Sequence, residues 1–168
     1  MTDNLTPPQR SYAMSRVHSK DTRPELLLRK SLFGRGLRFR KHVRTLPGTP
    51  DIVFPAARVA VFVDGEFWHG YQLSRWRSKL SDWWLTKIEG NVARDQRLRT
   101  QLRQQGWTVV RLWQRQIIAN TDRAADRVEA VVRHHRSRVV HPHCSGVTNL
   151  GQNQRRRGPT ADQATGDP

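Results

Sequence analysis

One short stretch of the chain holds carboxylates and a histidine at a spacing that could assemble a hydrolytic site. Asp51 opens a β-rich apolar run, and the segment VFVDGEFWHG (Val61–Gly70) is a second such run that leads into Asp64, Glu66 and His69. Carboxylate oxygens are the ligands that Mg²⁺ and Ca²⁺ prefer, and histidine is the side chain that can take a proton near neutral pH. The stretch therefore predicts a divalent cation beside a general base.

These groups can meet only if the two runs pair. Pro50–Phe54 and the run that starts at Val61 are separated by the turn-like Pro55-Ala56-Ala57, which favours adjacent antiparallel strands with Asp51 near the His69 end. A simpler interpretation exists, because acids at strand ends are often solvated turn residues and a Phe-Trp pair after an apolar strand is usually core.

Composition points to a polyanionic partner. The 168-residue chain has 30 Lys and Arg against 14 Asp and Glu, a formal net charge of +16, and residues 1–130 alone contain 24 basic and 12 acidic residues. Neutralised phosphates release counterions and drive association, so nucleic acid is the expected partner. No apolar run has membrane-spanning length, and the start of the chain does not resemble a secretory signal, so a cytoplasmic protein is expected. Cys144 is the only cysteine, which excludes a disulfide framework within one chain.

The remaining elements follow from local patterns. Thr22-Arg23-Pro24-Glu25 fits a capping box, and Glu25 could either cap this helix or face a metal site. The order of elements predicts an α/β fold with a mixed central β-sheet flanked by helices. The expected elements are a helix from Thr22 to Gly34, a half-exposed strand over Leu37–Val43, a helix over Trp83–Gln105 stopped by Gly106, a core strand over Trp107–Trp113 and a helix over Asp122–His135. Residues 1–20 are expected to be a flexible basic arm, 21–135 one domain, and 136–168 a disordered basic tail.

A second surface combines aromatic rings with cations. The segment 71–81 carries Arg75, Trp76 and Arg77, and the following helix presents Arg94 with further arginines on one face. Bases stack on aromatic rings while cations hold phosphates, so the pattern favours a nucleic-acid surface, although a charged helix face is usually only solvated.

Four motifs carry a resemblance to a known family. LPGTPDIVF, VFVDGEFWHG, KIEGNVARDQR and GWTVVRLW follow one another in order, and together they closely resemble the very short patch repair (Vsr) endonucleases over roughly residues 10–115. The resemblance implies a restriction-endonuclease-like core. It also implies Mg²⁺-dependent nicking of one DNA strand, 5′ of the thymine at a T:G mismatch.

The resemblance also implies roles for single residues. Asp51 would be the metal-binding carboxylate, and the backbone carbonyl of Val63 a second ligand. His69 would be the general base, Asp95 would orient it, and Glu25 would lie near the metal or its water ligands.

Further residues match the DNA-contacting positions of the family. Phe67, Trp68 and Trp84 correspond to the aromatic residues that wedge into the base stack beside the mismatch. Arg75 and Arg77 are expected DNA contacts, and so is Arg94.

The sequence departs from the family at the positions that hold a structural zinc in its best-known members. Glu66, Tyr71, Leu73 and Arg115 stand there, so no structural zinc is expected. Asp64 adds an acid, which is either a further metal ligand or the partner of an arginine.

The expected substrate is therefore double-stranded DNA with a T:G mismatch. Mismatch-repair proteins and a cytosine-5 methyltransferase system are expected partners, the location is cytoplasmic and nucleoid-associated, and a monomer is expected. Two alternatives remain: a non-catalytic basic DNA-binding protein, or a related nuclease with a restriction or branched-DNA substrate.

Overall fold

A four-stranded mixed sheet forms the centre of the protein, and the computed structural model describes residues 20–140 together with residues 6, 9 and 12. In spatial order the strands are β1 (Arg40–Lys41), β2 (Ile52–Phe54), β3 (Val59–Asp64) and β4 (Thr108–Trp113). β1 pairs with β2 and β2 with β3 in antiparallel register, whereas β3 and β4 are parallel. The expected mixed sheet and the antiparallel pair are both confirmed.

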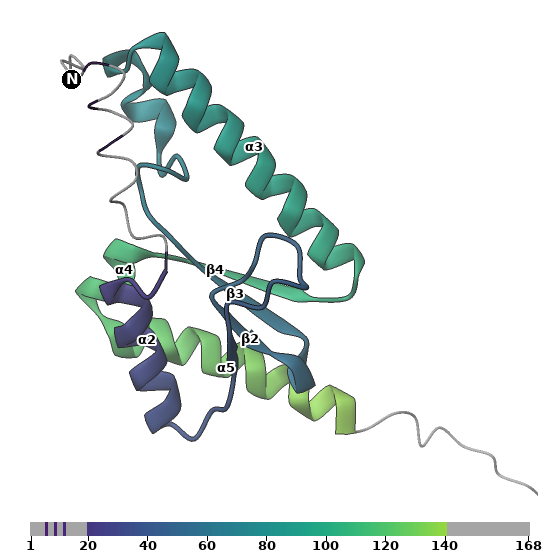
Figure 1. Ribbon diagram of the computed structural model, residues 1–168. Helices are drawn as coiled ribbons and strands as arrows, with labels where there is room; N and C mark the ends of the chain where they lie inside the picture. Colours follow the sequence, from purple (N-terminus) through teal and green to yellow (C-terminus); the bar gives the residue numbers. More distant parts are fainter. Residues whose placement is uncertain (1–5, 7–8, 10–11, 13–19, 141–168) are drawn as a thin grey trace, which may run out of the picture.

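Helices cover both faces of this sheet. α3 lies along one face, and α2, α4 and α5 lie on the other, so the fold has three layers (Figure 1). The helices are α2 (Arg23–Gly34), α3 (Asp82–Gln104), α4 (Gln114–Ala119) and α5 (Thr121–Val140), with short 3-10 helices η1 (Pro55–Ala57), η2 (Leu73–Arg75) and η3 (Arg77–Lys79). This architecture confirms the expected α/β fold with flanking helices.

The face under α2 and α5 is an aliphatic core. Val59, Val61 and Val63 alternate along β3, and their side chains belong to one buried cluster with Leu28 of α2 and Val128 of α5. Side chains alternate across a strand, so the intervening residues of β3 must face the opposite layer. β3 is buried along its whole length because both layers cover it.

The sheet face under α3 is apolar along most of β3 and charged at the end of this strand. Ala60 and Phe62 are buried against Leu102 of α3, and Asp64 continues the same row at the end of β3. On the neighbouring strand, Arg111 alternates with Val110 and Leu112 of the other core, so Arg111 belongs to the α3 face as well. The polar residues of the sheet are thereby concentrated on one face and at one end.

Local signals placed most helices correctly. Glu25 accepts hydrogen bonds from the backbone N–H and the hydroxyl of Thr22, as its place in a capping box requires. α3 runs over nearly the expected residues and is followed by Gly106, whose φ of +78° explains why a glycine ends the helix there.

Four local predictions need correction. The strand expected over Leu37–Val43 shrinks to Arg40–Lys41, because His42 takes a φ of +47° that extended backbone does not allow. The expected loop at 71–81 contains η2 and η3, and α4 was not predicted. α5 runs to Val140 instead of His135.

The expected terminal segments lie mostly outside the described residues, including residues 141–168 and most of 1–19. Within the described part of the chain, no helix has the length and apolar character needed to cross a bilayer.

Candidate active site

The strand register places Asp51 next to the backbone of Val63. The Asp51 N–H donates to the carbonyl of Val61 at 3.0 Å, and the Val63 N–H donates to Asp51 Oδ2 at 2.8 Å. The N–H and C=O of one strand residue point to the same side, so the Val63 carbonyl is directed to the side on which Asp51 lies. A side-chain carboxylate and a main-chain carbonyl are therefore adjacent at the end of β3.

The electrostatic environment of Asp51 favours a cation. The pKa of Asp51 is raised from 3.8 to about 6, mainly by burial. The hydrogen bond from Val63 opposes this rise, and the nearby carboxylates of Glu25 and Asp64 add to it. A positive ion would offset this unfavourable burial of negative charge. Hard oxygen donors in a site with surplus negative charge fit a divalent cation.

His69 reaches the site from the loop that follows β3. Its Nδ1 lies 2.5 Å from Asp95 Oδ2 of α3. Burial raises the pKa of Asp95, but its hydrogen bond with His69 and the attraction of His69 and of nearby arginines give a net lowering, so this carboxylate is the charged partner. An Nδ1–H that donates to Asp95 leaves Nε2 as the ring nitrogen that can accept a proton.

Asp51 and His69 line the same pocket. The pocket has a volume of about 750 Å³, and Val63, Asp64 and Glu25 are also part of its wall. The two side chains come from different segments and reach a single hollow between the sheet, α2 and α3. This convergence is what the sequence required for a hydrolytic site.

Asp64 is held by arginine. It is 4% exposed, and its Oδ2 accepts a hydrogen bond from Arg111 Nε at 2.5 Å. Arg99 Nη1 lies 3.8 Å from the same oxygen. Of the two roles expected for Asp64, these contacts correspond to the arginine pair.

Glu25 belongs to a second charged cluster on the opposite wall of the pocket. Arg29 forms ion pairs with Glu25 and Asp21, and its Nη2 lies 3.1 Å from His42 Nε2. Glu25 also accepts from the backbone N–H groups of Asp21 and Thr22. Both of its oxygens are thus engaged by groups of this cluster.

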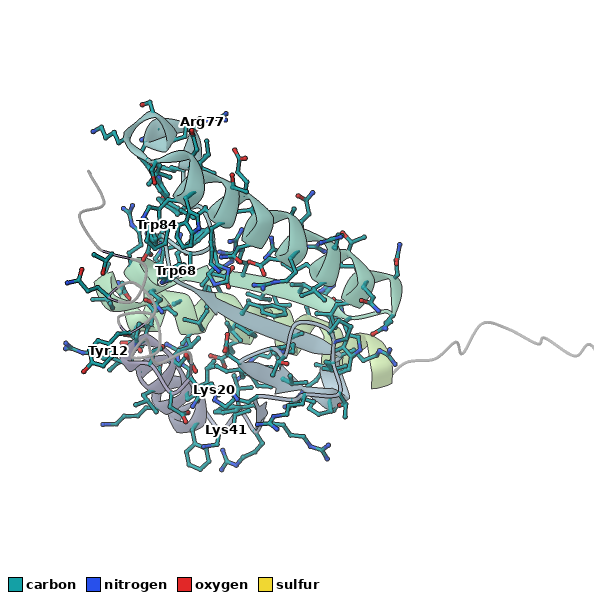
Figure 2. The ribbon with its side chains drawn as sticks, turned by 45° about the horizontal axis from the view of Figure 1, so that its top comes forward. Tyr12, Lys20, Lys41, Trp68, Arg77 and Trp84 are labelled. Atoms are coloured by element: carbon teal, nitrogen blue, oxygen red, sulfur yellow. The ribbon has the colours of Figure 1, made fainter. Side chains whose placement is uncertain are left out.

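The expected wedge residues form one aromatic cluster. The ring of Phe67 stacks on that of Trp76 with centroids 5.7 Å apart, and it meets Trp68 and Trp84 edge-on at 5.0 and 5.3 Å. Trp68 also lines the pocket, and Phe67 is 37% exposed. Figure 2 shows Trp68 and Trp84 side by side on the α3 side, with Lys20 and Lys41 on the side of α2.

The expected basic contacts differ in position. Arg94 lines the pocket, close to Asp95 of the same helix. Arg75 and Arg77 are exposed on η2 and η3, and Arg77 lies 3.4 Å from Glu89 of α3.

The positions that match zinc ligands in the family contact one another. Glu66 Oε1 accepts from the backbone N–H of Arg115 at 2.8 Å. The Tyr71 ring lies between Trp113, with centroids 4.8 Å apart, and the Arg115 guanidinium, 5.0 Å from its centroid. The loop after β3 is therefore tied to the start of α4, and Leu73 begins η2 next to it.

Several residues at the site were not predicted from the sequence. His42 was missed because it acquires its partners only through folding. Arg29 had a local signal, since it follows Glu25 by four residues on α2, a spacing that favours an ion pair. Arg111 had one visible signal, since it is a charged residue inside the apolar run VVRLW. Other residues at the site that were not predicted include Asp21, Asn91 and Arg99.

Comparison with known proteins identifies similar sequences. Residues 2–75 match the family model described as DNA mismatch endonuclease Vsr. The chain is 49% identical over 116 residues to the type II nicking enzyme V.XorIIP of Xanthomonas oryzae pv. oryzae, an alignment that covers 68% of this chain and 85% of that one. It is 41% identical over 134 residues to the type II nicking enzyme V.NmeDIP of Neisseria meningitidis serogroup C, with coverage of 78% and 90%. It is 37% identical over 107 residues to the DNA mismatch endonuclease Vsr of Escherichia coli, with coverage of 62% and 69%.

Fold and similarity together define a DNA nicking endonuclease, a hydrolase of phosphodiester bonds. This conclusion confirms the expected enzyme and sets aside the non-catalytic DNA-binding alternative. The chain belongs to the Vsr DNA mismatch endonuclease family, and that membership implies a metal ion.

Proposed function

We propose that this enzyme nicks one strand of double-stranded DNA on the 5′ side of the thymine in a T:G mismatch, in very short patch mismatch repair. Asp51 and the carbonyl oxygen of Val63 would hold Mg²⁺, and His69 would act as the general base. The observation that carries the proposal is the convergence of Asp51 and His69 on one pocket.

The proton chemistry rests on His69 and Asp95. Nε2 of His69 takes the proton of the attacking water, and the imidazolium that forms is stabilised by the Asp95 carboxylate at Nδ1. Asp95 also fixes the tautomer, because a neutral ring that donates at Nδ1 must accept at Nε2. A base positioned in this way contributes a rate factor on the order of 10² to 10⁴.

The metal chemistry rests on Asp51 and Val63. When bound, Mg²⁺ polarises the phosphate and stabilises the charge that develops on the departing oxygen. Asp51 Oδ2 is held by the Val63 N–H, which orients the carboxylate toward the pocket. Glu25 would lie near the metal or its water ligands, and its place on the pocket wall supports this position.

The mismatch preference would come from the aromatic cluster. Inserting Phe67, Trp68 and Trp84 into the base stack costs a few kcal/mol of unstacking, and this cost is smallest at a mispaired step. Arg94 at the pocket, with Arg75 and Arg77 farther along the surface, would contact phosphates on either side. The partial exposure of Phe67 supports this role.

The loop at the zinc-ligand positions would function without zinc. The contacts of Glu66, Tyr71 and Arg115 already tie this loop to the start of α4. The remaining partners of the proposal are mismatch-repair proteins and a cytosine-5 methyltransferase system, and the enzyme would act as a cytoplasmic monomer.

A panel of labelled duplexes tests the proposed substrate. Matched, T:G-mismatched and branched duplexes are incubated with the purified enzyme and Mg²⁺, and Asp51→Ala serves as the control for contaminating nuclease. We expect a nick in the T-containing strand of the T:G duplex, immediately 5′ of the thymine, with no cleavage by Asp51→Ala.

The other outcomes are equally informative. Cleavage of matched or branched DNA at the same rate as the T:G duplex would replace the mismatch substrate by the restriction or branched-DNA alternative. Nicking by Asp51→Ala at the wild-type rate would refute the metal site. Activity that disappears with a zinc-selective chelator in excess Mg²⁺ would refute the zinc-free loop.

A further inference from the structure

We propose that Asp64 and Arg111 are positioning residues that act as a pair, holding the backbone of the His69 loop so that the imidazole stays in place for proton transfer. This inference rests on the proposed role of His69 as general base. It assigns Asp64 to the support of that base and removes it from the set of metal ligands.

Arg111 connects two elements that would otherwise be independent. Its Nε donates to Asp64 Oδ2 at 2.5 Å, and its Nη2 donates to the backbone carbonyl of His69 at 3.2 Å. One planar guanidinium thus binds the end of β3 and the loop that follows it. The loop between Asp64 and His69 is closed at both ends by this one side chain.

Arg111 is itself held in one orientation. Its guanidinium carbon lies 3.9 Å from the ring centroid of Trp113, two residues along β4 on the same face. The stacking fixes the plane of the guanidinium, and the bond to Asp64 fixes its rotation within that plane. The contact to His69 is therefore made by a group that has little freedom to move.

The buried charge of Asp64 explains why it needs Arg111. Its carboxylate is almost fully buried, and a buried charge requires a paired partner. Arg111 supplies that partner, and Arg99 lies at 3.8 Å on the same oxygen. A metal bound directly by this oxygen would have to compete with two cationic side chains.

Asp95 and Arg111 hold different parts of His69, whose backbone N–H also donates to the carbonyl of Gly65 at 3.3 Å and whose Nδ1 lies 3.9 Å from Asp64 Oδ1. Asp95 holds the ring at Nδ1, and Arg111 holds the backbone at the carbonyl oxygen. The first contact sets the tautomer, and the second sets the position from which the ring extends. Misplacement of a catalytic group by about 1 Å can lower a rate by about 100-fold, so the second contact affects catalysis as well.

The test compares variants of the pair in the full-length enzyme. Single-turnover nicking of the T:G duplex with Mg²⁺ and DNA affinity without divalent metal are measured for Arg111→Met, Asp64→Asn, Asp64→Ala and the double variant Asp64→Ala/Arg111→Met. Arg123→Met is the matched control, because Arg123 is exposed on α5 away from the pocket.

The expected result is a loss of rate without a loss of binding. Arg111→Met and Asp64→Ala should each slow nicking by about 10- to 100-fold. This is the usual loss when a residue that orients a functional group through a hydrogen bond is replaced. Asp64→Asn should lose less, because an amide oxygen still accepts from Arg111. The double variant should be no slower than the slower single variant, since both changes break one unit.

A metal titration separates this role from ligation. The Mg²⁺ concentration for half-maximal nicking should rise much less in Asp64→Asn and Asp64→Ala than in Asp51→Asn, because Asp64 contributes only a nearby charge. A rise as large as that of Asp51→Asn would make Asp64 a metal ligand and overturn the proposal. Fully additive losses in the double variant would overturn it too.

A spectroscopic readout does not depend on the substrate. The proton on His69 Nδ1 is observed by NMR, and Arg111→Met should increase its exchange with water while leaving the amide of Val61 in the core protected. An unchanged His69 signal would overturn the proposal. If the wild-type enzyme does not nick T:G duplexes, the proposed substrate fails, and this measurement still decides whether Arg111 holds His69.

Discussion

The two faces of the central sheet differ in the kinds of side chain that they bury. On the α2 and α5 face, Val59, Val61 and Val63 lie in a continuous aliphatic core. On the α3 face the same strand changes after Phe62 from apolar residues to Asp64, which is buried and ion-paired. The contrast indicates that one face supplies most of the stability, and that the other can hold buried charges because the first is so well packed.

The largest expected effect is on the chemical step. His69→Ala should lower the single-turnover rate by about 10²- to 10⁴-fold and leave the free energy of unfolding nearly unchanged, because the side chain is on the polar face and outside both cores. Added imidazole should restore part of the rate by replacing the missing base. A wild-type rate in this variant would contradict the assigned role.

In the aliphatic core, the expected effect of a substitution is on the free energy of unfolding. Leu28 is fully buried, so Leu28→Ala should lower the free energy of unfolding by about 2–5 kcal/mol in urea denaturation. Leu26→Ala is the matched control on the same helix, since Leu26 is 52% exposed and should change stability by less than about 0.5 kcal/mol. Equal losses in both variants would show that α2 is not packed as described.

Asp51 should show a conflict between stability and function. Its pKa in the folded protein, about 6, lies above the ordinary value of 3.8, so the folded state binds the proton more tightly than the unfolded state. The free energy of unfolding therefore falls as the pH rises from about 4 to about 6, by up to about 3 kcal/mol, and stays lower above that range. Without metal, Asp51→Asn should be more stable than wild type at pH 8 and similar to it near pH 4.

Mg²⁺ provides the control for this prediction. It should stabilise the wild-type protein against urea at pH 8 and have little effect on Asp51→Asn, because only the wild type has the charged ligand. Below about pH 6 the affinity of the wild type for Mg²⁺ should fall about tenfold per pH unit, as protons compete for the carboxylate. If Asp51→Asn without metal were less stable than wild type at pH 8, the result would argue against an unpaired buried charge at Asp51.

The smallest effect is expected at the glycine that follows His69. Gly70 has a φ of +64°, and a Cβ there would lie 2.7 Å from Cγ2 of Val92 in α3. Gly70→Ala should cost about 1–2 kcal/mol for the left-handed backbone and should displace the loop that carries His69, which calorimetry and nicking assays would detect together. Gly90→Ala is the opposite control: its position in α3 has open space, so a gain of about 0.5–1 kcal/mol is expected.

Local sequence patterns were sufficient to predict most of the helices and strands and to select Asp51 and His69 as candidates. β-rich apolar runs predicted β2, β3 and β4, and the capping pattern at Thr22 predicted the start of α2. These signals are local, because side-chain periodicity and helix capping depend on residues a few positions apart. The convergence of Asp51 and His69 followed from the same local patterns, since a short turn between two strands leaves little choice of pairing.

The pairing of charges that are distant in the sequence depends on the folded arrangement of the chain. Asp64 and Arg111 are 47 positions apart, and they meet because β3 and β4 align in parallel register with both side chains on the α3 face. Arg29 and His42 meet in the same way across α2 and the end of β1. No local pattern encodes such partners, because the choice depends on register and burial. Water keeps exposed charges apart, whereas a buried charge is stable only with a partner, and the fold supplies the burial.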